Sequence, residues 1–403
     1  MHTSEMFRLV AIWVFRHSIK RDSVDFIPKI GITGKSIFFL GATGYVGGTV
    51  LTKLLALPTP PSKVTCLVRS PDKAKLFDQL TLPSGTTLTV LFGSLQDLDK
   101  LIAGAEEADV VINAASADDL DAVKALMQGM KNRKDETGHR SVFIETSGTG
   151  LFIDDARGEW ATDLIYTDLH PTPKTRDSPA LLSMEDVPPN APHREVDAAI
   201  NEGDARGDFK SFIIVPPTIW GAGQGEIYDK GISNSFSQQM PRLIKISLDR
   251  GAAAVVGKGA NIWGHVNVGD LGDLFAIIYQ RALQTASEGT KSAAIGHGKS
   301  GFYLSISGEY TSLAAAQAIG QAMVENKLGD SAQPTRLSEE EVQKYYGNSP
   351  YTGSNSRGRG DRSKSIGWRP KLADERDFLR GVREETVRVR KVFDGVYVPK
   401  KRS

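Results

Sequence analysis

The sequence predicts an α/β fold, a doubly wound parallel sheet followed by a smaller C-terminal region. Two patterns predict it: apolar runs that alternate with amphipathic helical segments from residue 36 onward, and a glycine-rich loop directly after the first run. Strands that alternate with helices pair in parallel through right-handed crossovers, and strands that are apolar throughout fit a sheet covered on both faces. The expected strands are 36–40, 63–68, 88–92, 109–114, 141–145 and 212–215.

Amphipathic segments separate these strands. In residues 45–57 the apolar side chains recur at helical spacing, and a proline-rich stretch at 58–61 ends the segment. Further helices are expected at 71–80, 97–105, 118–132 and 193–206, and in the second half of the chain at 234–250, 270–285, 311–327 and 373–392.

These elements divide the chain into three parts. Residues 1–35 form an N-terminal extension, 36–225 hold the parallel sheet, and 226–403 form a region that we expect to bind substrate and to pack partly back on the sheet. Within the sheet domain, 154–192 is rich in Asp, Pro and Thr without periodicity, which predicts a long excursion over the sheet edge. The stretch 347–365 resembles a low-complexity segment.

The composition excludes several classes of protein. Lys and Arg number 49 against 48 Asp and Glu, and nucleic-acid or anionic-membrane binding needs a standing positive field. The single cysteine, Cys66, excludes internal disulfides and Cys-based structural zinc, and the seven histidines show no metal-ligand spacing. The apolar run at 9–15 is shorter than the about 20 residues that span a bilayer. We expect a cytoplasmic protein, with a targeting segment in 1–35 as the alternative.

A phosphate-binding loop is predicted at 41–47, directly after the first strand. Its three glycines follow the spacing G-x-x-G-x-x-G and open a helix. Glycines let the backbone approach a pyrophosphate, and the helix N-terminus offers free N–H groups and the positive end of its dipole. Strand, loop and helix in this order predict a Rossmann-type dinucleotide site. The residues expected to contact the cofactor are Gly41, Thr43, Gly44, Tyr45, Val46 and Gly47.

The end of the second strand bears on the choice of cofactor. A ribose-binding acid is expected about 20 residues after the loop, but the chain has Arg69 and Ser70 there. Arg69 can face a 2′-phosphate in a bidentate manner, and Ser70 can add a donor. We therefore expect NADP, with NAD as the alternative and a solvated arginine as the other interpretation of Arg69.

Taken together, the motifs resemble the extended short-chain dehydrogenase/reductase family over residues 36–395. Besides the glycine loop, segments at 146–147, 265–270 and 367–370 resemble family motifs in the same order. The resemblance implies that the residues after the fourth strand lie against the cofactor and that those after the sixth strand flank the nicotinamide. These residues are Asn113, Ala114 and Ala115, and Pro216, Pro217 and Thr218.

One departure concerns the family's catalytic tyrosine and the lysine four residues later. By order along the chain, His193 stands where the tyrosine is expected and Asp197 where the lysine is expected. Tyr166 has no lysine four residues later and lies far upstream of Pro216. The sequence thus resembles the atypical branch of the family, which includes epimerase-like and nitrogen-metabolite-repressor-type proteins and keeps the cofactor site while altering the pair.

A histidine at this place offers another route to proton transfer, because imidazole titrates near neutral pH. His193 and Asp197 are spaced i, i+4, so we expect Asp197 to orient the imidazole and Ser147 to hydrogen-bond the substrate carbonyl. The alternative is that His193 only begins a helix behind Pro192. Acidic pairs such as 118–119 are interpreted as solvated surface.

The first prediction for function is an NADP-dependent oxidoreductase that acts on a carbonyl or alcohol of a small organic molecule. Two alternatives stay open: a regulator that senses NADP or NADPH without hydride transfer, and a redox-neutral epimerase or lyase that retains the cofactor. We expect a small-molecule substrate as partner, with a homodimer left open, and no nucleic acid, because aromatic stacking positions are missing around the arginines of 357–362.

Overall fold

The structure of the protein is a computed structural model that describes residues 34–173, 175, 180–284, 295–393 and 395–396. Apart from Gly34 and Lys35, the expected N-terminal extension with its alternative targeting segment lies outside the described residues. No helix in the described ranges is long and apolar enough to cross a membrane.

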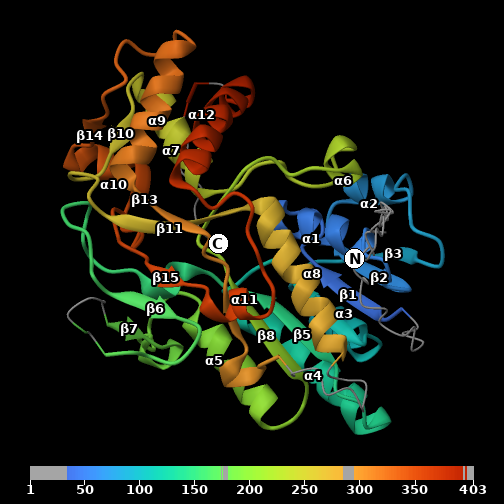
Figure 1. Ribbon diagram of the computed structural model, residues 1–403. Coiled ribbons are helices and arrows are strands. Elements are labelled where there is room, and N and C mark those ends of the chain that lie inside the picture. Colours follow the sequence, from blue (N-terminus) through green and yellow to red (C-terminus); the bar gives the residue numbers. More distant parts are fainter. Residues whose placement is uncertain (1–33, 174, 176–179, 285–294, 394, 397–403) are drawn as a thin grey trace, which may run out of the picture. The chain divides into compact units, whose positions relative to one another are not determined.

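A parallel sheet of seven strands forms the centre, which confirms the predicted fold class (Figure 1). Its strand order is β12-β8-β5-β4-β1-β2-β3, and every neighbouring pair is parallel. The order reverses between β1 and β4, and open α/β sheets bind ligands at such a switch point. The strands are β1 (Ser36–Leu40), β2 (Lys63–Val68), β3 (Thr87–Phe92), β4 (Val110–Asn113), β5 (Val142–Thr146), β8 (Lys210–Val215) and β12 (Phe302–Leu304).

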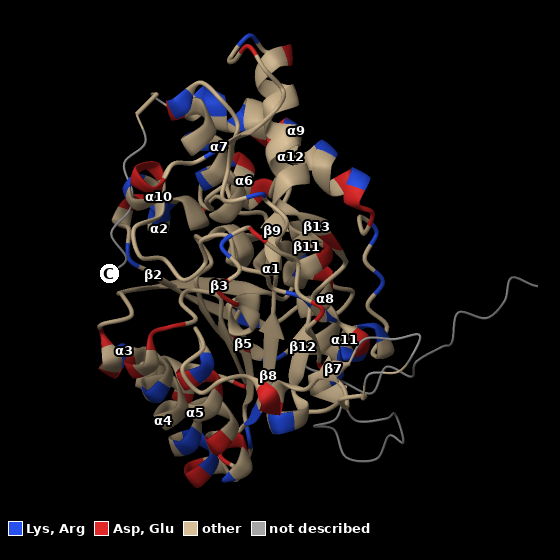
Figure 2. Cartoon of the chain, turned by 90° about the vertical axis from the view of Figure 1, so that its left-hand side faces the viewer, with Lys and Arg blue, Asp and Glu red and all other residues tan. Residues whose placement is uncertain are grey.

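Helices cover both faces of the sheet, because strand side chains alternate between two apolar cores. In β1, Ile37 and Phe39 belong to one core, and Phe38 and Leu40 belong to the other. Figure 2 shows residues of both charge signs interspersed along the helices that pack on the second of these cores. The first core includes α1 (Tyr45–Leu55), α2 (Pro71–Phe77) and α8 (Val268–Gln284), and the second includes α3 (Leu98–Glu106), α4 (Leu120–Thr137) and α5 (Arg194–Ala205).

The C-terminal part builds a second group of elements. A three-stranded sheet supports helices around an apolar core that contains Trp220, Tyr310 and Phe378. Its main elements are β9 (Thr218–Trp220), β11 (Ile262–Asn267), β13 (Gly308–Thr311), α7 (Gln239–Arg250), α9 (Ser312–Glu325) and α12 (Glu375–Val392). The shorter elements of this part are α6 (Glu226–Asp229), β10 (Ala254–Val255), β14 (Thr335–Arg336), α10 (Glu339–Tyr346), α11 (Asp361–Ser365) and η3 (Gly298–Ser300). Two further 3-10 helices, η1 (Thr149–Phe152) and η2 (Met184–Asp186), lie earlier in the chain.

One strand of the central sheet was not predicted. The six expected strands agree with the structure to within two residues at each end, but β12 joins the sheet beside β8 from far along the chain. A strand of three residues has no periodicity that a sequence pattern could reveal.

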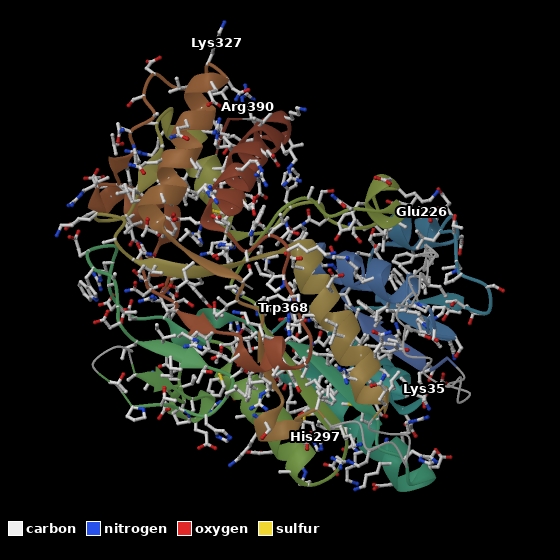
Figure 3. The ribbon with its side chains drawn as sticks, in the orientation of Figure 1. Lys35, Glu226, His297, Lys327, Trp368 and Arg390 are labelled. Carbon is white, nitrogen blue, oxygen red and sulfur yellow. The ribbon has the colours of Figure 1, made fainter. Side chains whose placement is uncertain are left out.

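Two sequence motifs of the C-terminal part meet at a buried tryptophan. Trp368 is fully buried, and its indole N–H donates to the carbonyl oxygen of Asp270 at 2.8 Å (Figure 3). The Asp270 carboxylate accepts the backbone N–H groups of Lys371 and Leu372, both at 3.0 Å. The segments 265–270 and 367–370 are therefore joined, which ties the chain before α12 to the start of α8.

The excursion at 154–192 contains more regular structure than its composition predicted. It includes β6 (Ile165–Thr167) and β7 (Leu181–Leu182), and β6 also pairs with β15 (Gly358–Arg359). The stretch 347–365 is thus ordered, and the Arg357 guanidinium makes a bidentate contact with Glu309 at 3.0 and 2.8 Å. The low-complexity interpretation of this stretch is wrong, because its polar residues pair with distant parts of the chain.

Asp168, directly after β6, joins the excursion to the central sheet. Its carboxylate is buried and accepts the backbone N–H groups of Leu304 in β12 at 3.0 Å and of Arg362 in α11 at 2.7 Å. The Ser363 N–H adds a third contact at 3.3 Å. A single side chain therefore holds three segments that are far apart in the sequence.

Replacing Asp168 by alanine leaves these buried N–H groups without an acceptor. An unsatisfied buried group costs about 1–3 kcal/mol, so we expect Asp168→Ala to lower the free energy of unfolding by at least about 2 kcal/mol in denaturant titrations. The control is Asp155→Ala, which removes an exposed carboxylate paired with Arg157 and should change stability by less than about 0.5 kcal/mol. Equal effects of the two changes would contradict the role given to Asp168.

Candidate active site

The phosphate loop at 41–47 is closed by contacts that only glycine allows. Gly41 has a φ of 89°, and a Cβ there would lie 2.4 Å from the Ala114 carbonyl oxygen. A Cβ at Gly47 would lie 2.0 Å from the Gly41 carbonyl oxygen. The backbones of the phosphate loop, the end of β4 and the start of α1 are therefore in direct contact.

Gly44 has a different environment. It is the N-cap of α1, and its N–H donates to the Gly41 carbonyl at 2.8 Å. A Cβ at Gly44 would meet only that carbonyl oxygen within 4 Å, at 3.1 Å. The backbone is thus open at the helix N-terminus, and the first turn of α1 contains no acidic residue. Such a cradle fits an anionic pyrophosphate.

The other loop residues can contact a cofactor mainly through their backbone N–H groups. The Val46 side chain packs against the first core, and the Tyr45 hydroxyl donates to the Gly221 carbonyl at 2.6 Å. The Thr43 carbonyl accepts the Asn234 N–H at 3.0 Å. Their contact with a cofactor stays a prediction, in which the N–H groups are the atoms that bind.

The residues after β4 lie beside the phosphate loop. The Ala114 N–H donates to the Leu40 carbonyl at 3.0 Å, so this backbone continues the β1–β4 pairing. Asn113 is buried, and its amide donates to both oxygens of Glu145 at 3.1 and 3.0 Å. Ala115 is exposed. Of the three predicted cofactor contacts, Asn113 is therefore buried against β5, whereas the two alanines are more exposed.

At the end of β2, Lys73 is a second cation close to the predicted cofactor contacts Arg69 and Ser70. Arg69 is exposed, whereas the Ser70 hydroxyl accepts the Lys73 N–H at 3.4 Å and caps α2. Partial burial and the neighbouring charge of Arg69 lower the pKa of Lys73. Lys73 was not among the residues predicted from the sequence. A cation in the first turn of a helix opposes the helix dipole, and this unfavourable position is a sequence signal that can indicate an anion-binding residue.

His193 begins α5 in the left-handed region, with a φ of 69°. Non-glycine residues adopt this conformation at a cost of about 1–3 kcal/mol, and such strain gathers at functional sites. The imidazole Nδ1 lies 2.6 Å from Oδ1 of Asp118, in the chain after β4. Nε2 lies 3.5 Å from the Tyr351 hydroxyl and faces the backbone of Gly148 and Gly150.

This geometry corrects two expectations. Asp197 does not hydrogen-bond the imidazole: it is fully buried, and its Oδ2 accepts the Ser147 hydroxyl at 2.9 Å. The pair Asp118 and Asp119 is not merely solvated, since Asp118 pairs with His193 and Asp119 caps α4. The physical reason is that His193 precedes the first helical residue, so its side chain does not follow the i, i+4 spacing within α5.

The segment after β8 packs against the same turn. The Ser147 N–H donates to the Ile214 carbonyl at 2.9 Å, and the Thr149 N–H donates to the Pro216 carbonyl at 3.0 Å. Thr218 is buried, and its hydroxyl donates to Gln239 Oε1 at 2.9 Å. Pro216 and Pro217 are buried as well. The expected contact of these residues with a nicotinamide stays a prediction.

Comparison with known proteins bears on the cofactor. Residues 41–176 match the NAD(P)H-binding family model, which covers the phosphate loop and the end of β5. Over these residues the chain is similar to NAD(P)H-binding proteins. Among sequence relatives, an oxidase of Acremonium is 28% identical over 302 residues, which cover 73% of this chain and 80% of the oxidase. A phenylcoumaran benzylic ether reductase of Ginkgo biloba is 35% identical over 105 residues, 24% of this chain and 32% of the reductase.

Solved structures share the fold around the matched residues. UDP-glucuronic acid 4-epimerase of Bacillus cereus, in complex with NAD, has a TM-score of 0.56 at 15% identity and covers 89% of this chain and 100% of its own. dTDP-glucose 4,6-dehydratase of Bacillus anthracis has a TM-score of 0.54 at 14% identity, with 88% and 96% covered. The chain therefore shares the fold of this epimerase and this dehydratase.

Two carboxyl groups near the carboxyl end of β5, those of Asp197 and Glu145, are buried. Burial raises the pKa of Asp197 to about 7, although the Ser147 hydrogen bond opposes the shift. Burial also raises the pKa of Glu145 well above its usual range, against the hydrogen bond from Asn113, and the Asp197 charge raises it further. The two groups disfavour each other's ionisation, so protonation of this pair couples β5 to α5.

The raised pKa of Asp197 predicts a pH-dependent stability. The folded state holds a proton between the unfolded pKa of about 3.9 and the folded value of about 7, so this group stabilises the fold at low pH and the contribution is lost as pH rises through that window. Asp197→Asn removes the titration and should melt above the wild type at about pH 8, with the difference shrinking at about pH 5.

Differential scanning fluorimetry across this pH range measures the effect. The control is Asp330→Asn, at an exposed carboxylate, which should keep the wild-type pH dependence. An Asp197→Asn variant whose stability follows pH as the wild type does would contradict the assignment.

Proposed function

We propose that the protein is an NADP-dependent oxidoreductase that acts on a carbonyl or alcohol group of a small organic molecule, with His193 as its acid–base group. The observation that carries the proposal is the 2.6 Å contact between Asp118 and Nδ1 of His193, which turns Nε2 toward the 147–150 backbone at the carboxyl end of β5. The names of the two relatives, an oxidase and a reductase, support redox chemistry.

The Asp118 carboxylate accepts the Nδ1–H of His193, so Nε2 is the ring atom that can take or give a proton. When bound, the nicotinamide supplies or accepts the hydride. In the reducing direction, Nε2–H would give its proton to the carbonyl oxygen. In the oxidising direction, neutral Nε2 would take the proton of the hydroxyl group.

A second donor is needed to hold the substrate oxygen. Ser147 was expected in that role, but its hydroxyl donates to Asp197 and only 6% of the residue is exposed. The Tyr351 hydroxyl lies 3.5 Å from Nε2 of His193 and belongs to the C-terminal segment that pairs with the excursion. We assign the second hydrogen bond to Tyr351, for which the sequence offers no motif.

A second candidate function is a sensor that binds the dinucleotide without hydride transfer. It is favoured by the burial of Asp197, because a fully buried carboxyl cannot hold the nicotinamide ribose as the family's lysine does. A redox-neutral reaction would instead require His193 and a cofactor that returns to its starting state. Activity of the His193 variant separates the sensor from both kinds of enzyme.

We expect His193→Ala to lower turnover by about a hundredfold or more, the scale of a positioned acid–base group, without changing the NADP dissociation constant. Asp118→Asn should lower turnover by about ten- to a hundredfold, because the amide no longer selects the Nδ1–H tautomer. The measurement is the change in NADPH absorbance with a panel of small aldehydes, ketones and alcohols.

Glu195→Gln, at an exposed position in the first turn of α5, is the control and should keep full turnover. If His193→Ala keeps wild-type turnover, the acid–base role is wrong. If the wild type binds NADP and changes no NADPH absorbance with the panel, the oxidoreductase is contradicted, and the sensor and the redox-neutral enzyme stay open.

Selection of the 2′-phosphate is tested at the end of β2. A charge-assisted contact contributes about 1.5–3 kcal/mol, so Arg69→Ala should weaken NADP about ten- to a hundredfold and leave NAD unchanged in calorimetry. Lys73→Ala should act in the same direction. The control is Lys75→Ala, which removes an exposed cation from the last turn of α2. Equal losses for NADP and NAD would assign Arg69 a structural role.

A further inference from the structure

Three carbonyl groups of the phosphate loop receive hydrogen bonds from one distant segment, residues 228–234, which we call the brace. The Ser233 hydroxyl donates to the Ala42 carbonyl at 2.7 Å. The Asn234 N–H donates to the Thr43 carbonyl at 3.0 Å. The Tyr228 hydroxyl donates to the Tyr45 carbonyl at 2.5 Å. The brace therefore contacts the face of the phosphate loop on which these carbonyl oxygens lie.

The brace is buried and closely fitted. Tyr228 is 8% exposed and Ser233 is 4% exposed. The Tyr228 hydroxyl also lies 2.7 Å from the Thr49 hydroxyl in α1. A Cβ at Gly48 would lie 2.3 Å from Ser233 Oγ, so α1 approaches the brace at a glycine. Water has little access to these contacts. The brace donates to the Ala42 and Thr43 carbonyls, whereas the Tyr45 carbonyl also accepts the Thr49 hydroxyl at 3.4 Å.

The brace is also anchored at its other side. Glu226, in α6 just before the brace, accepts the backbone N–H of Thr81 at 2.9 Å and its hydroxyl at 3.1 Å (Figure 3). Tyr45 reaches back in the opposite direction and donates its hydroxyl to the Gly221 carbonyl at 2.6 Å. The segment between Gly221 and Asn234 is thus attached at several points to the sheet domain.

These contacts determine where the loop presents its donors. In a trans peptide the N–H points away from the C=O of the same unit. Carbonyls that face the brace therefore direct the N–H groups of Thr43 and Val46 to the opposite side, where Gly44 leaves the backbone open. A loop held in this orientation before the ligand arrives does not lose ordering free energy on binding.

We propose that Tyr228 and Ser233 are positioning residues for the pyrophosphate of the dinucleotide: they hold the phosphate loop with its N–H groups turned toward the ligand. The proposal rests on the dinucleotide binding of the proposed function and does not depend on hydride transfer. It assigns to the C-terminal part of the chain a role in cofactor affinity, in addition to any contact with substrate.

The first test measures NADP affinity in Ser233→Ala and Tyr228→Phe, with Ser237→Ala as the control. Ser233→Ala removes the donor to the Ala42 carbonyl. A hydrogen bond contributes about 0.5–1.5 kcal/mol, so the dissociation constant for NADP should rise about two- to tenfold. Tyr228→Phe removes one oxygen and should weaken NADP to a similar extent. Ser237→Ala is the matched control, because the Ser237 hydroxyl is buried without a hydrogen-bond partner among the described residues, and its NADP affinity should be that of the wild type.

The second test separates positioning from a general loosening of the site. Adenosine 2′-phosphate has the adenosine and the 2′-phosphate of NADP but no pyrophosphate, so its affinity should be the same in the wild type, Ser233→Ala and Tyr228→Phe. Equal weakening of both ligands would overturn the proposal, as would an NADP affinity that neither variant changes. Failure of the wild type to bind any dinucleotide would already reject the proposed function, and the brace role with it, before a variant is measured.

Discussion

The structure depends on the close approach of β1 and β4 at the switch point of the sheet. The turn at Gly41 lies so near the Ala114 carbonyl that a Cβ would come within 2.4 Å of it. This contact sets the start of α1, because Gly47 packs on the Gly41 carbonyl. It also places the chain after β4, including Asp118, beside the cofactor crevice. A larger residue at Gly41 would displace the loop, the helix and the partner of His193 together.

Around this contact, the site is assembled from separate segments of the chain. The phosphate loop comes from β1, Asp118 from the chain after β4, His193 from the start of α5 and Tyr351 from the C-terminal part. Each segment is supported by buried polar groups: Glu145 holds Asn113, Asp197 holds Ser147 and Asp168 holds the excursion to β12. Buried polar networks of this kind stabilise one arrangement only when their members are satisfied. Asp197 has one oxygen without a hydrogen-bond partner among the described residues, and burial raises its pKa to about 7.

The C-terminal part does more than cover the site. It supplies β12 to the central sheet, joins 265–270 to 367–370 through Trp368, and holds the phosphate loop through the brace. The two groups of elements therefore share contacts, and residues from both halves of the chain adjoin the phosphate loop and His193.

Six strands, the phosphate loop and the basic end of β2 could be predicted from the sequence, because each depends on local periodicity or spacing within a single segment. The pairing of His193 with Asp118 and not with Asp197, and the places of Tyr351, Lys73 and the brace, depend on contacts between distant segments. The i, i+4 expectation failed because the left-handed φ of His193 places it outside the helix. Contacts such as Ser233 with Ala42 join residues far apart in the chain, and no local pattern records which carbonyl a distant hydroxyl will reach.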